Sequence, residues 1–424
     1  MAAPSGPSRR RLIYVDMAYT LKIVRARCHE DFWHARHCGG YFPIVWGVHP
    51  LADVPDEETR RRRPRVAKFS SSQLAIEGTS RALRLPRWML PLNFLLSQWL
   101  LVRSLAKRAA RRGVSAVFVN DPLYSGLFGA ILARFLRVPL IVFVPAQFDE
   151  LYEATGALGN PRIFRTRRIE QAVMRWVFSR ADMVFAAAES VAELARNYGA
   201  QPDSIARLSH GKYLARCHLA EPVARSSPEA ALARFGIPRA ANYLICVGRQ
   251  TPVKHPQDAL RAMKMVINAR DDVIGIMAGE GDLNSSLKDE ARDLGISSRV
   301  AFPGLIDQPS LSVILPHCVT LSPLTGMALI EASLAGSAVV AYDRDWQSEF
   351  VRDGESGFVV PFGDWRAMAD RALQILGDPS LRRRLSAAAR QRALDFVDVE
   401  GNRKLEHAAL DAMFERWASK ARRP

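Results

Sequence analysis

The stretch VTLSPLTGMALIEASLAGSAVVAYD, residues 319–343, contains the pattern that decides the fold class. A short β-branched run at 319–323 leads through a glycine turn into a helical pattern from about Met327 to Ala335, and a second β-branched run follows at 338–342. Both runs are continuously apolar, which is typical of strands buried on both faces of a parallel sheet. The stretch therefore predicts a β–α–β unit with a crossover helix.

The same alternation of short apolar runs and helical patterns continues along all 424 residues. The other predicted strands are 12–15, 43–48, 116–120, 140–144 and 183–187 in the first half, and 243–248, 273–279, 300–304 and 357–360 in the second. Eleven strands exceed one comfortable sheet, and the Pro-, Ser- and Ala-containing stretch 221–242 is the predicted linker. We therefore predict an α/β protein of two Rossmann-like domains, 1–225 and 226–395, whose doubly wound parallel sheets face a ligand-binding cleft.

Charge is distributed unevenly between the two halves. Residues 1–225 contain 34 Lys and Arg against 18 Asp and Glu, whereas residues 226–424 contain 25 of each kind, so the whole net charge of +16 belongs to the first half. This asymmetry predicts an anionic partner for the first half: an acidic substrate, an anionic membrane surface or nucleic acid. Nucleic acid is disfavoured because no recognised binding module accompanies the charge.

Composition and cysteine usage indicate the compartment. Apolar residues make up 48% and charged residues 24%, as in soluble globular proteins. Five scattered cysteines without C-x-x-C spacing indicate neither a disulfide framework nor a cysteine zinc site, which favours a reducing cytoplasm. The longest nearly apolar stretch, 88–102, has fifteen residues, fewer than a transmembrane helix requires, and no signal peptide is predicted.

The first half nevertheless has a segment suited to a membrane surface. Residues 81–112 place Arg and Lys around Trp88, Met89, Leu90, Phe94 and Trp99, and further cations occur at 60–63 and 65–68. Cations beside aromatic and aliphatic side chains are what an interfacial membrane-binding segment needs. The alternative is a buried helix flanked by solvated arginines, and the sequence leaves both readings open.

A candidate anion site lies in the second half. Arg249 leaves the end of the strand at 243–248 and Lys254 follows five residues later, a pairing that suits a diphosphate or, alternatively, a solvated surface. Gly326 allows close backbone approach, and the amides of Met327 and Ala328 at a helix start favour a phosphate. Glu331 lies about one turn further along, where it could bind a ribose or else face solvent.

Two other clusters were considered as metal sites. Asp343-Arg344-Asp345 is a D-x-D pattern, which binds divalent cations in some glycosyltransferases but is common by chance at solvated turns. His29, His34 and His37 with Cys28 and Cys38 fit no standard zinc spacing, so structural or acceptor-lining roles are favoured. We therefore predict no metal and no cofactor.

Together these segments resemble a known family. Residues 243–395 resemble the donor domain of the glycosyl transferases group 1 family, retaining enzymes of the GT-B fold. The matching segments, in order, are VGRQTPVK, IMAGEGDL, RVAFPGLID, GMALIEASLAGSAVVAYD and EFVRDGESGFVVPFGD. Two segments of the first half, NDPLYSGLFGAILARFLRVPLIVFV and ADMVFAAAESVAELARNYGAQPDSIARLSHG, match the family's acceptor domain more loosely, so the resemblance covers most of residues 115–395.

The resemblance implies roles for particular residues. Arg249 and Lys254 would hold the nucleotide diphosphate, Glu331 the ribose hydroxyls, and the backbone from Phe302 through Gly304 to Leu305 the base. The segment 396–424 would be a terminal helix that returns to the first domain. His210, Gly211 and Lys212 occupy the place of a turn near the cleft, where they would touch donor phosphate or acceptor, with a surface turn as the alternative.

The sequence also departs from the family pattern at three places. Pro323 stands where the family usually has a Glu that contacts the donor sugar, and Pro145 stands where many members have a His near the reacting sugar. DMAYTLKI, residues 16–23, replaces the family's Gly-Gly turn. Asp149 and Glu150 are the nearest carboxylates to the missing His and are candidate catalytic residues.

The predicted function is retaining transfer of a sugar from a nucleotide-diphosphate sugar to a lipid-linked or polysaccharide acceptor. The expected location is the cytoplasm, with peripheral contact to the inner face of the cytoplasmic membrane. Two alternatives stay open: a nucleotide-sugar epimerase or glycoside phosphorylase on the same scaffold, and a catalytically silent nucleotide-sugar-binding scaffold protein, which Pro323 and Pro145 would favour.

Overall fold

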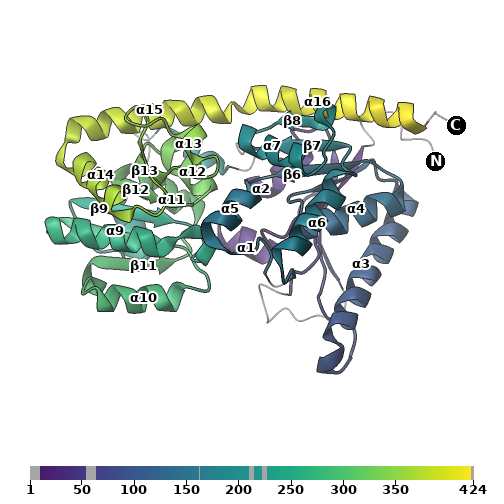
Figure 1. Cartoon of the computed structure of the whole chain (residues 1–424), viewed down its shortest axis with the longest axis horizontal. Coiled ribbons are helices and arrows are strands. Elements are labelled where there is room, and N and C mark those ends of the chain that lie inside the picture. The colour runs from purple at the N-terminus through teal and green to yellow at the C-terminus, as the bar shows by residue number, and fades with distance from the viewer. Residues whose placement is uncertain (1–9, 54–63, 162, 210–213, 222–226, 422–424) are drawn as a thin grey trace.

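The computed structural model describes residues 10–53, 64–161, 163–209, 214–221 and 227–421. These residues form two lobes, each built on a mainly parallel sheet packed with helices (Figure 1). The strand order is β3-β4-β2-β1-β5-β6-β7-β8 in the first sheet and β11-β10-β9-β12-β13-β14 in the second. The predicted fold of two doubly wound α/β domains is confirmed.

The first lobe contains the basic half of the chain. Its strands are β1 (Arg11–Val15), β2 (Ile44–His49), β3 (Arg65–Lys68), β4 (Gln73–Glu77), β5 (Ala116–Val119), β6 (Leu140–Val144), β7 (Met183–Ala186) and β8 (Ile205–Arg207). Its helices are α1 (Leu21–Ala26), α2 (Asp31–His34), α3 (Leu90–Arg112), α4 (Tyr124–Leu136), α5 (Phe148–Thr155), α6 (Arg167–Phe178) and α7 (Glu189–Asn197), with 3-10 turns η2 (Ala35–His37), η4 (Arg87–Met89), η5 (Pro202–Ser204) and η7 (Arg216–Leu219).

The second lobe contains the predicted donor segments. Its strands are β9 (Asn242–Val247), β10 (Val273–Ala278), β11 (Val300–Gly304), β12 (Cys318–Ser322), β13 (Ala338–Tyr342) and β14 (Phe358–Val360). Its helices are α8 (Glu229–Arg234), α9 (Pro256–Ala269), α10 (Asn284–Asp293), α11 (Gln308–Ile314), α12 (Met327–Leu334), α13 (Gln347–Phe350), α14 (Trp365–Gly377) and α15 (Pro379–Val397), with 3-10 turns η9 (Pro252–Lys254), η10 (Ser297–Arg299) and η11 (Leu315–His317); α16 (Val399–Ala421) ends the described chain.

Strand β9 shows why the apolar runs become buried strands. Leu244 and Cys246 pack into one core of the second lobe, while Tyr243, Ile245 and Val247 pack into the core on the other face of the sheet. Because successive side chains point to opposite faces, a strand covered on both sides needs apolar residues at every position. β9 pairs in parallel with β10 and β12, so their carboxyl ends meet at one edge.

Three strands were not predicted, and two of them form an edge hairpin. β3 pairs antiparallel with β4, and the basic run 65–68 is therefore an edge strand of the first sheet. Alternate residues of β3 are exposed, which makes its pattern shorter and less apolar than that of a central strand. Cationic side chains on an edge strand hinder pairing with another chain. β8, the third, has three residues and forms the opposite edge.

The predicted linker is not structureless. Residues 229–234 of the stretch 221–242 form the short helix α8, whose Leu232 is buried. Residues 222–226 lie outside the described part of the chain. One apolar residue per turn gave no helical period strong enough to predict α8.

After the second lobe the chain returns to the first. Helices α15 and α16 run along one side of both lobes (Figure 1), and α16 buries Leu410 and Met413 in a core of the first lobe. The hydroxyl of Tyr41 donates a hydrogen bond of 2.5 Å to Asp411 on α16. The terminal segment thus fastens the second lobe to the first.

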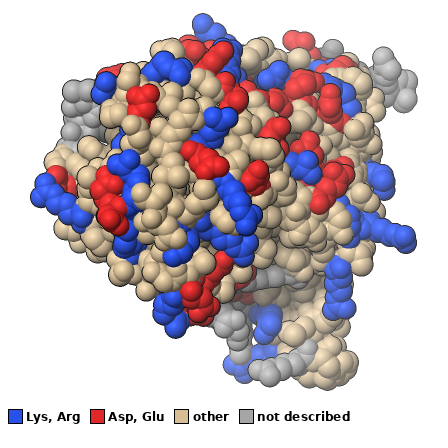
Figure 2. All heavy atoms as spheres, turned by 60° about the vertical axis from the view of Figure 1, so that its left-hand side comes forward, with Lys and Arg blue, Asp and Glu red and all other residues tan. Residues whose placement is uncertain are grey.

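Positive and negative side chains are mixed on one face of the protein. Figure 2 shows Lys and Arg interspersed with Asp and Glu on the face that it turns forward. This mixture agrees with the zero net charge of residues 226–424. No helix among the described residues is long and apolar enough to span a bilayer.

Candidate functional site

The loop after β9 is fixed by close packing against the loop after β10. The amide of Gly248 donates to the carbonyl of Ala278 at 3.0 Å, and that of Gln250 donates to Glu280 at 2.9 Å. A Cβ on Gly279 would lie 1.9 Å from the carbonyl oxygen of Gly248, and Gly279 has a φ of +134°. Only glycine permits this approach, so the GEG sequence at 279–281 determines where Arg249 leaves the sheet.

Lys254 and Arg249 line one small cavity. Lys254 ends the 3-10 turn η9, and the cavity is also lined by Gly248, Gln250 and Thr325. A Cβ placed on Gly326 would lie 3.4 Å from the Nζ atom of Lys254. The structure therefore brings the two predicted cations and the glycine before α12 together, although 72 residues separate Lys254 from Gly326.

Burial and like charge act together on Lys254. Desolvation and the neighbouring Arg249 guanidinium lower the pKa of Lys254 to about 8, and Asp345 partly opposes them. Two cations held together destabilise each other, and Asp345 compensates for this only in part. This arrangement favours the binding of an anionic group in the cavity.

Helix α12 begins where an anion could be bound. Gly326 has a φ of +70° and precedes Met327, the first residue of the helix. The first amides of a helix have no carbonyl partner one turn earlier, and the helix dipole makes that end positive. Lys254 and the start of α12 thus approach one another from different loops.

Glu331 lies on the buried side of α12. Its side chain is 4% exposed, so the alternative in which it faces solvent is wrong. It is close enough to His29 of the first lobe to raise the pKa of that imidazole, although desolvation dominates and the net shift of the His29 pKa is downward. Glu331 does not line the cavity of Arg249 and Lys254 but lies one turn further along α12.

Residues 302–305 border the same edge of the second sheet. The amide of Gly279 donates to the carbonyl of Gly304 at 2.8 Å, which joins the end of β11 to the glycine loop. Phe302 packs against the core, whereas the side chain of Leu305 is 40% exposed. These residues lie beside the cation loop, at the place predicted for the base.

Pro323 is part of a fixed turn before α12. Its carbonyl accepts a 2.8 Å hydrogen bond from the Nε2 of Gln347, and the same amide accepts through its oxygen from the hydroxyl of Ser322 at 2.7 Å. The hydroxyls of Ser322 and Thr325 are 2.5 Å apart. Gln347 therefore holds the turn rigid although no carboxylate stands at position 323.

Asp345 contacts the other lobe instead of completing a metal site. Its carboxylate accepts a 3.0 Å hydrogen bond from the amide of Gln147, just before α5, and lies close enough to Lys254 to lower its own pKa. Burial outweighs these effects and raises the pKa of Asp345 to about 6. No group of three or more His, Cys, Asp or Glu side chains arranged to hold a metal ion occurs among the residues that the structure describes.

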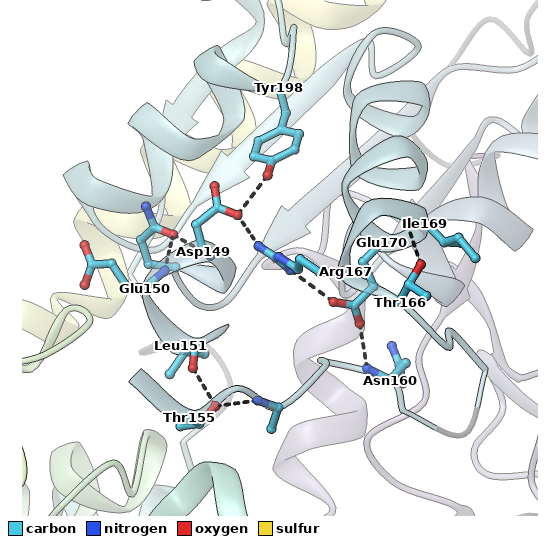
Figure 3. A network of polar contacts seen from close by, with 12 residues as sticks. Asp149, Glu150, Leu151, Thr155, Asn160, Thr166, Arg167, Ile169, Glu170 and Tyr198 are labelled. Carbon is cyan, nitrogen blue, oxygen red and sulfur yellow. Dashed lines mark hydrogen bonds and ion pairs between the residues drawn. The ribbon is translucent and has the colours of Figure 1, made fainter. Parts of the chain in front are cut away.

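The two candidate carboxylates on α5 have different surroundings. Asp149 is an ion-pair partner of Arg167 and accepts a 2.8 Å hydrogen bond from Tyr198, within the network drawn in Figure 3. Glu150 instead accepts a 3.3 Å hydrogen bond from the amide of Asp345 across the lobe interface. Asp149 is thus occupied by the first lobe's own network, and Glu150 joins the lobes. His210, Gly211 and Lys212 lie outside the described residues.

Sequence reasoning missed a polar cluster at the carboxyl edge of the first sheet. Asp16 follows β1, is 1% exposed and accepts a 2.7 Å ion-paired hydrogen bond from Arg36. Asp121 follows β5, and burial raises its pKa to about 6. The available signal was an acidic residue within two positions of the end of an apolar run, in YVD and VND. In doubly wound folds such strand ends border the ligand cleft.

Comparison with known families agrees with this geometry. The sequence profile described as glycosyl transferases group 1 matches residues 229–392, and that of the glycosyl transferase 4-like domain matches residues 35–211. Each profile covers one lobe. The second lobe therefore matches the glycosyl transferases group 1 profile, and the first lobe matches a glycosyl transferase 4-like profile.

Curated relatives are similar over part of their length. A D-inositol 3-phosphate glycosyltransferase of Streptomyces scabiei is 33% identical over 230 residues, 49% of each chain. One from Thermomonospora curvata is 31% identical over 62% of this chain and 64% of its own. The chain thus matches about half to two thirds of the length of these relatives.

Solved structures share the GT-B fold. Sucrose-phosphate synthase from Thermosynechococcus elongatus superposes with a TM-score of 0.72 at 17% identity, over 96% of this chain and 100% of its own. Anabaena HepE in complex with UDP-glucose gives 0.68 at 17% identity, over 95% and 99%. At this identity the likeness shows the fold alone.

The network of Figure 3 gives a prediction about stability. Arg167 bonds Glu170, which is fully buried, at 3.0 Å as well as Asp149. We expect Arg167→Leu to lower the free energy of unfolding by about 3–5 kcal/mol, because it leaves a buried carboxylate without its cation. Urea denaturation followed by circular dichroism measures this loss.

The matched control is Arg196→Leu. Arg196 bonds Glu189 at 2.8 Å, but both side chains are more than 40% exposed. Solvent screens that pair, so we expect a loss below about 1 kcal/mol. If the two variants lost the same free energy of unfolding, Arg167 would contribute no more than an exposed ion pair does. The Asp149 network would then not hold α5 and α6 together.

Proposed function

We propose that the protein transfers a sugar from a nucleoside-diphosphate sugar to an acceptor hydroxyl, with retention of configuration at the anomeric carbon. The observation that carries the proposal is the convergence of Arg249, Lys254 and the start of α12 on one edge of the second sheet. The match of the second lobe to the glycosyl transferases group 1 profile supports the same reaction.

The proposed chemistry depends on stabilising a leaving group. As the bond between the anomeric carbon and the phosphate oxygen breaks, negative charge develops on the diphosphate and positive charge on the sugar ring. Fixed cations and helix-end amides aimed at the developing charge are the largest catalytic contribution available to such a site. Arg249 and Lys254 would act as catalytic residues in this sense, with the amides of Met327 and Ala328.

Retention needs no strong protein base in this scheme. The acceptor oxygen forms its bond on the face that the diphosphate leaves, and the acceptor proton passes to an oxygen of the departing diphosphate. This route accommodates Pro145 in place of a histidine and Asp149 engaged by Arg167. Arg249 and Lys254 would supply the charge that a divalent metal supplies in other transferases, so we propose a reaction without metal or cofactor.

The remaining site residues would bind the nucleoside. Glu331 lies one turn from the proposed phosphate position, where a carboxylate can accept hydrogen bonds from ribose hydroxyls. The backbone from Phe302 to Leu305, at the end of β11, would contact the base. Gly304, with a φ of +70°, allows the chain to turn there.

We also propose a lipid-linked or polysaccharide acceptor, bound by the basic first lobe on the cytoplasmic side of a membrane. Support comes from the +16 net charge carried by residues 1–225 and from the polar cluster around Asp16 and Asp121 at the cleft edge of the first sheet. Product analysis with anomeric NMR assignment tests both the linkage and the retention.

Removal of either cation tests the donor site. We expect Arg249→Ala and Lys254→Ala each to weaken UDP binding by about 10- to 100-fold, because each loses a charge-assisted hydrogen bond. Isothermal titration calorimetry measures the affinities. The control is Arg239→Ala. The side chain of Arg239 is 82% exposed and pairs with Glu229, so this variant should bind UDP as the wild type does.

Unchanged affinity in both alanine variants would refute the donor site. Tight UDP binding without turnover, tested over several UDP-, GDP- and ADP-sugars and acceptors, would instead support a catalytically silent scaffold protein. Interconversion of a sugar donor without any acceptor would indicate an epimerase.

The lowered pKa of Lys254 predicts pH-dependent binding. With a pKa of about 8, Lys254 is charged at neutral pH and loses its proton in the free protein as the pH rises. A bound diphosphate favours the ammonium, so binding above pH 8 must take up a proton. If the diphosphate restores an ordinary lysine pKa, affinity for UDP should fall about tenfold between about pH 7 and pH 9.

Calorimetry in two buffers of different ionisation enthalpy measures this proton uptake directly. Lys254→Arg should remove the dependence, since a guanidinium stays protonated throughout this range. An affinity that is flat with pH in the wild type, or equally steep in Lys254→Arg, would contradict the assignment of the titrating group.

A further inference from the structure

Helix α3 projects from the first lobe (Figure 1), and several of its large apolar side chains are exposed. Leu92, Leu95 and Trp99 are 43%, 64% and 53% exposed, and Trp88, in the turn η4 just before the helix, is 80% exposed. Spacings of three and four residues place the three helical positions along one stripe. We call Trp88, Leu92, Leu95 and Trp99 the outer stripe.

The opposite side of the same turns is polar and buried. Asn93, Ser97 and Gln98 are 2%, 3% and 8% exposed. Their side chains bond the backbone of the segment 79–83 in four places: Asn93 donates to the Leu83 carbonyl at 2.9 Å and accepts from its amide at 3.1 Å, Ser97 accepts from the amide of Ala82 at 2.7 Å, and Gln98 donates to the Thr79 carbonyl at 3.1 Å.

This arrangement is the reverse of a helix that packs on a core by its apolar face. The first turns of α3 are held by hydrogen bonds to 79–83 and by Phe94, which packs against the core beside Tyr124. Further along, Leu101 and Leu105, each 1% exposed, pack into the first lobe. The outer stripe therefore makes no contribution to the core. An exposed apolar row of this size on a folded protein marks an interaction surface.

Charge specifies the partner. No Asp or Glu occurs between Gly78 and Asn120, whereas that segment contains eight Lys and Arg residues. Arg81 and Arg84 are exposed beside η4, and the guanidinium of Arg103 lies 5.3 Å from the ring of Trp99 at the other end of the stripe. Apolar side chains framed only by cations complement anionic headgroups above acyl chains.

We propose that the outer stripe inserts into the interface of a bilayer containing anionic lipid, with Arg81, Arg84 and Arg103 contacting the headgroups. Two leucines between the tryptophans offer no stacking platform for bases, so a lipid surface fits better than nucleic acid. Of the two readings that the sequence left open for residues 81–112, the exposures favour the surface segment for the first turns of α3, whereas the helix buries Leu101 and Leu105 further along. The proposal does not depend on the donor site or on turnover.

Vesicle flotation tests the proposal without an activity readout. We expect the full chain to float with vesicles of equal parts phosphatidylglycerol and phosphatidylcholine, to remain below pure phosphatidylcholine vesicles, and to be released in part by high salt. Leu95→Ser combined with Trp99→Ser should reduce the apparent vesicle affinity by about tenfold or more, because it removes two inserting side chains.

A matched control separates the stripe from general surface hydrophobicity. Leu405→Ser changes a side chain on α16 that is 60% exposed, close to the 64% of Leu95, and should float as the wild type does. Arg81→Glu combined with Arg84→Glu should lose the preference for phosphatidylglycerol. All variants change exposed side chains, so thermal unfolding should match that of the wild type.

Three outcomes would overturn the proposal. The first is a wild type that does not float with anionic vesicles, and the second is a stripe variant that floats as well as the wild type. The third is a dimer in sedimentation velocity that Leu95→Ser dissociates, together with absent flotation, which would show that a second copy of the chain covers the stripe.

Discussion

The proposed donor site depends on two cations held close together at the carboxyl edge of the second sheet. Arg249 and Lys254 repel each other, and burial adds to the cost by lowering the pKa of Lys254. Backbone packing enforces this arrangement. A Cβ on Gly281 would lie 2.3 Å from the carbonyl oxygen of Gln250, so the loop after β10 can pack on the loop after β9 only with glycine at this position. The fold thus holds two cations together at a cost that a bound anion would offset. In the proposed reaction a diphosphate would supply that anion, and its developing charge would be stabilised most in the transition state.

Hydrogen bonds beside this site join the two lobes, and a bound donor would lie next to them. Asp345 accepts from Gln147 and donates its own amide to Glu150, while Glu349 accepts from the hydroxyl of Ser190 at 2.8 Å. Asp345 also lies beside Lys254 as a partial counter-ion. The D-x-D sequence that suggested a metal site therefore has an interlobe position. Sequence spacing could not distinguish these roles, because the partner of Asp345 lies 198 residues away.

Prediction from sequence succeeded where burial imposes a simple pattern. The central strands of both sheets are mostly apolar because helices cover both faces, and all eleven predicted strands are present. β3 and β8 were missed because these edge strands are short and partly exposed, so their composition resembles that of loops. β4 lies between β3 and β2, but its sequence QLAIE has polar residues at both ends, which leave only a short apolar run. That Arg249, Lys254 and Gly326 lie together could be predicted because each adjoins a strand or helix end. Asp16, His29 and the reversed faces of α3 could not, since their surroundings are set by contacts distant in sequence.

A crystal structure of the protein with bound UDP tests the central claim most directly. The account predicts diphosphate oxygens within hydrogen-bonding distance of the Arg249 guanidinium, the Lys254 Nζ and the first amides of α12, with the ribose toward Glu331. A diphosphate bound elsewhere in the cleft, with Arg249 and Lys254 not contacting it, would contradict the account.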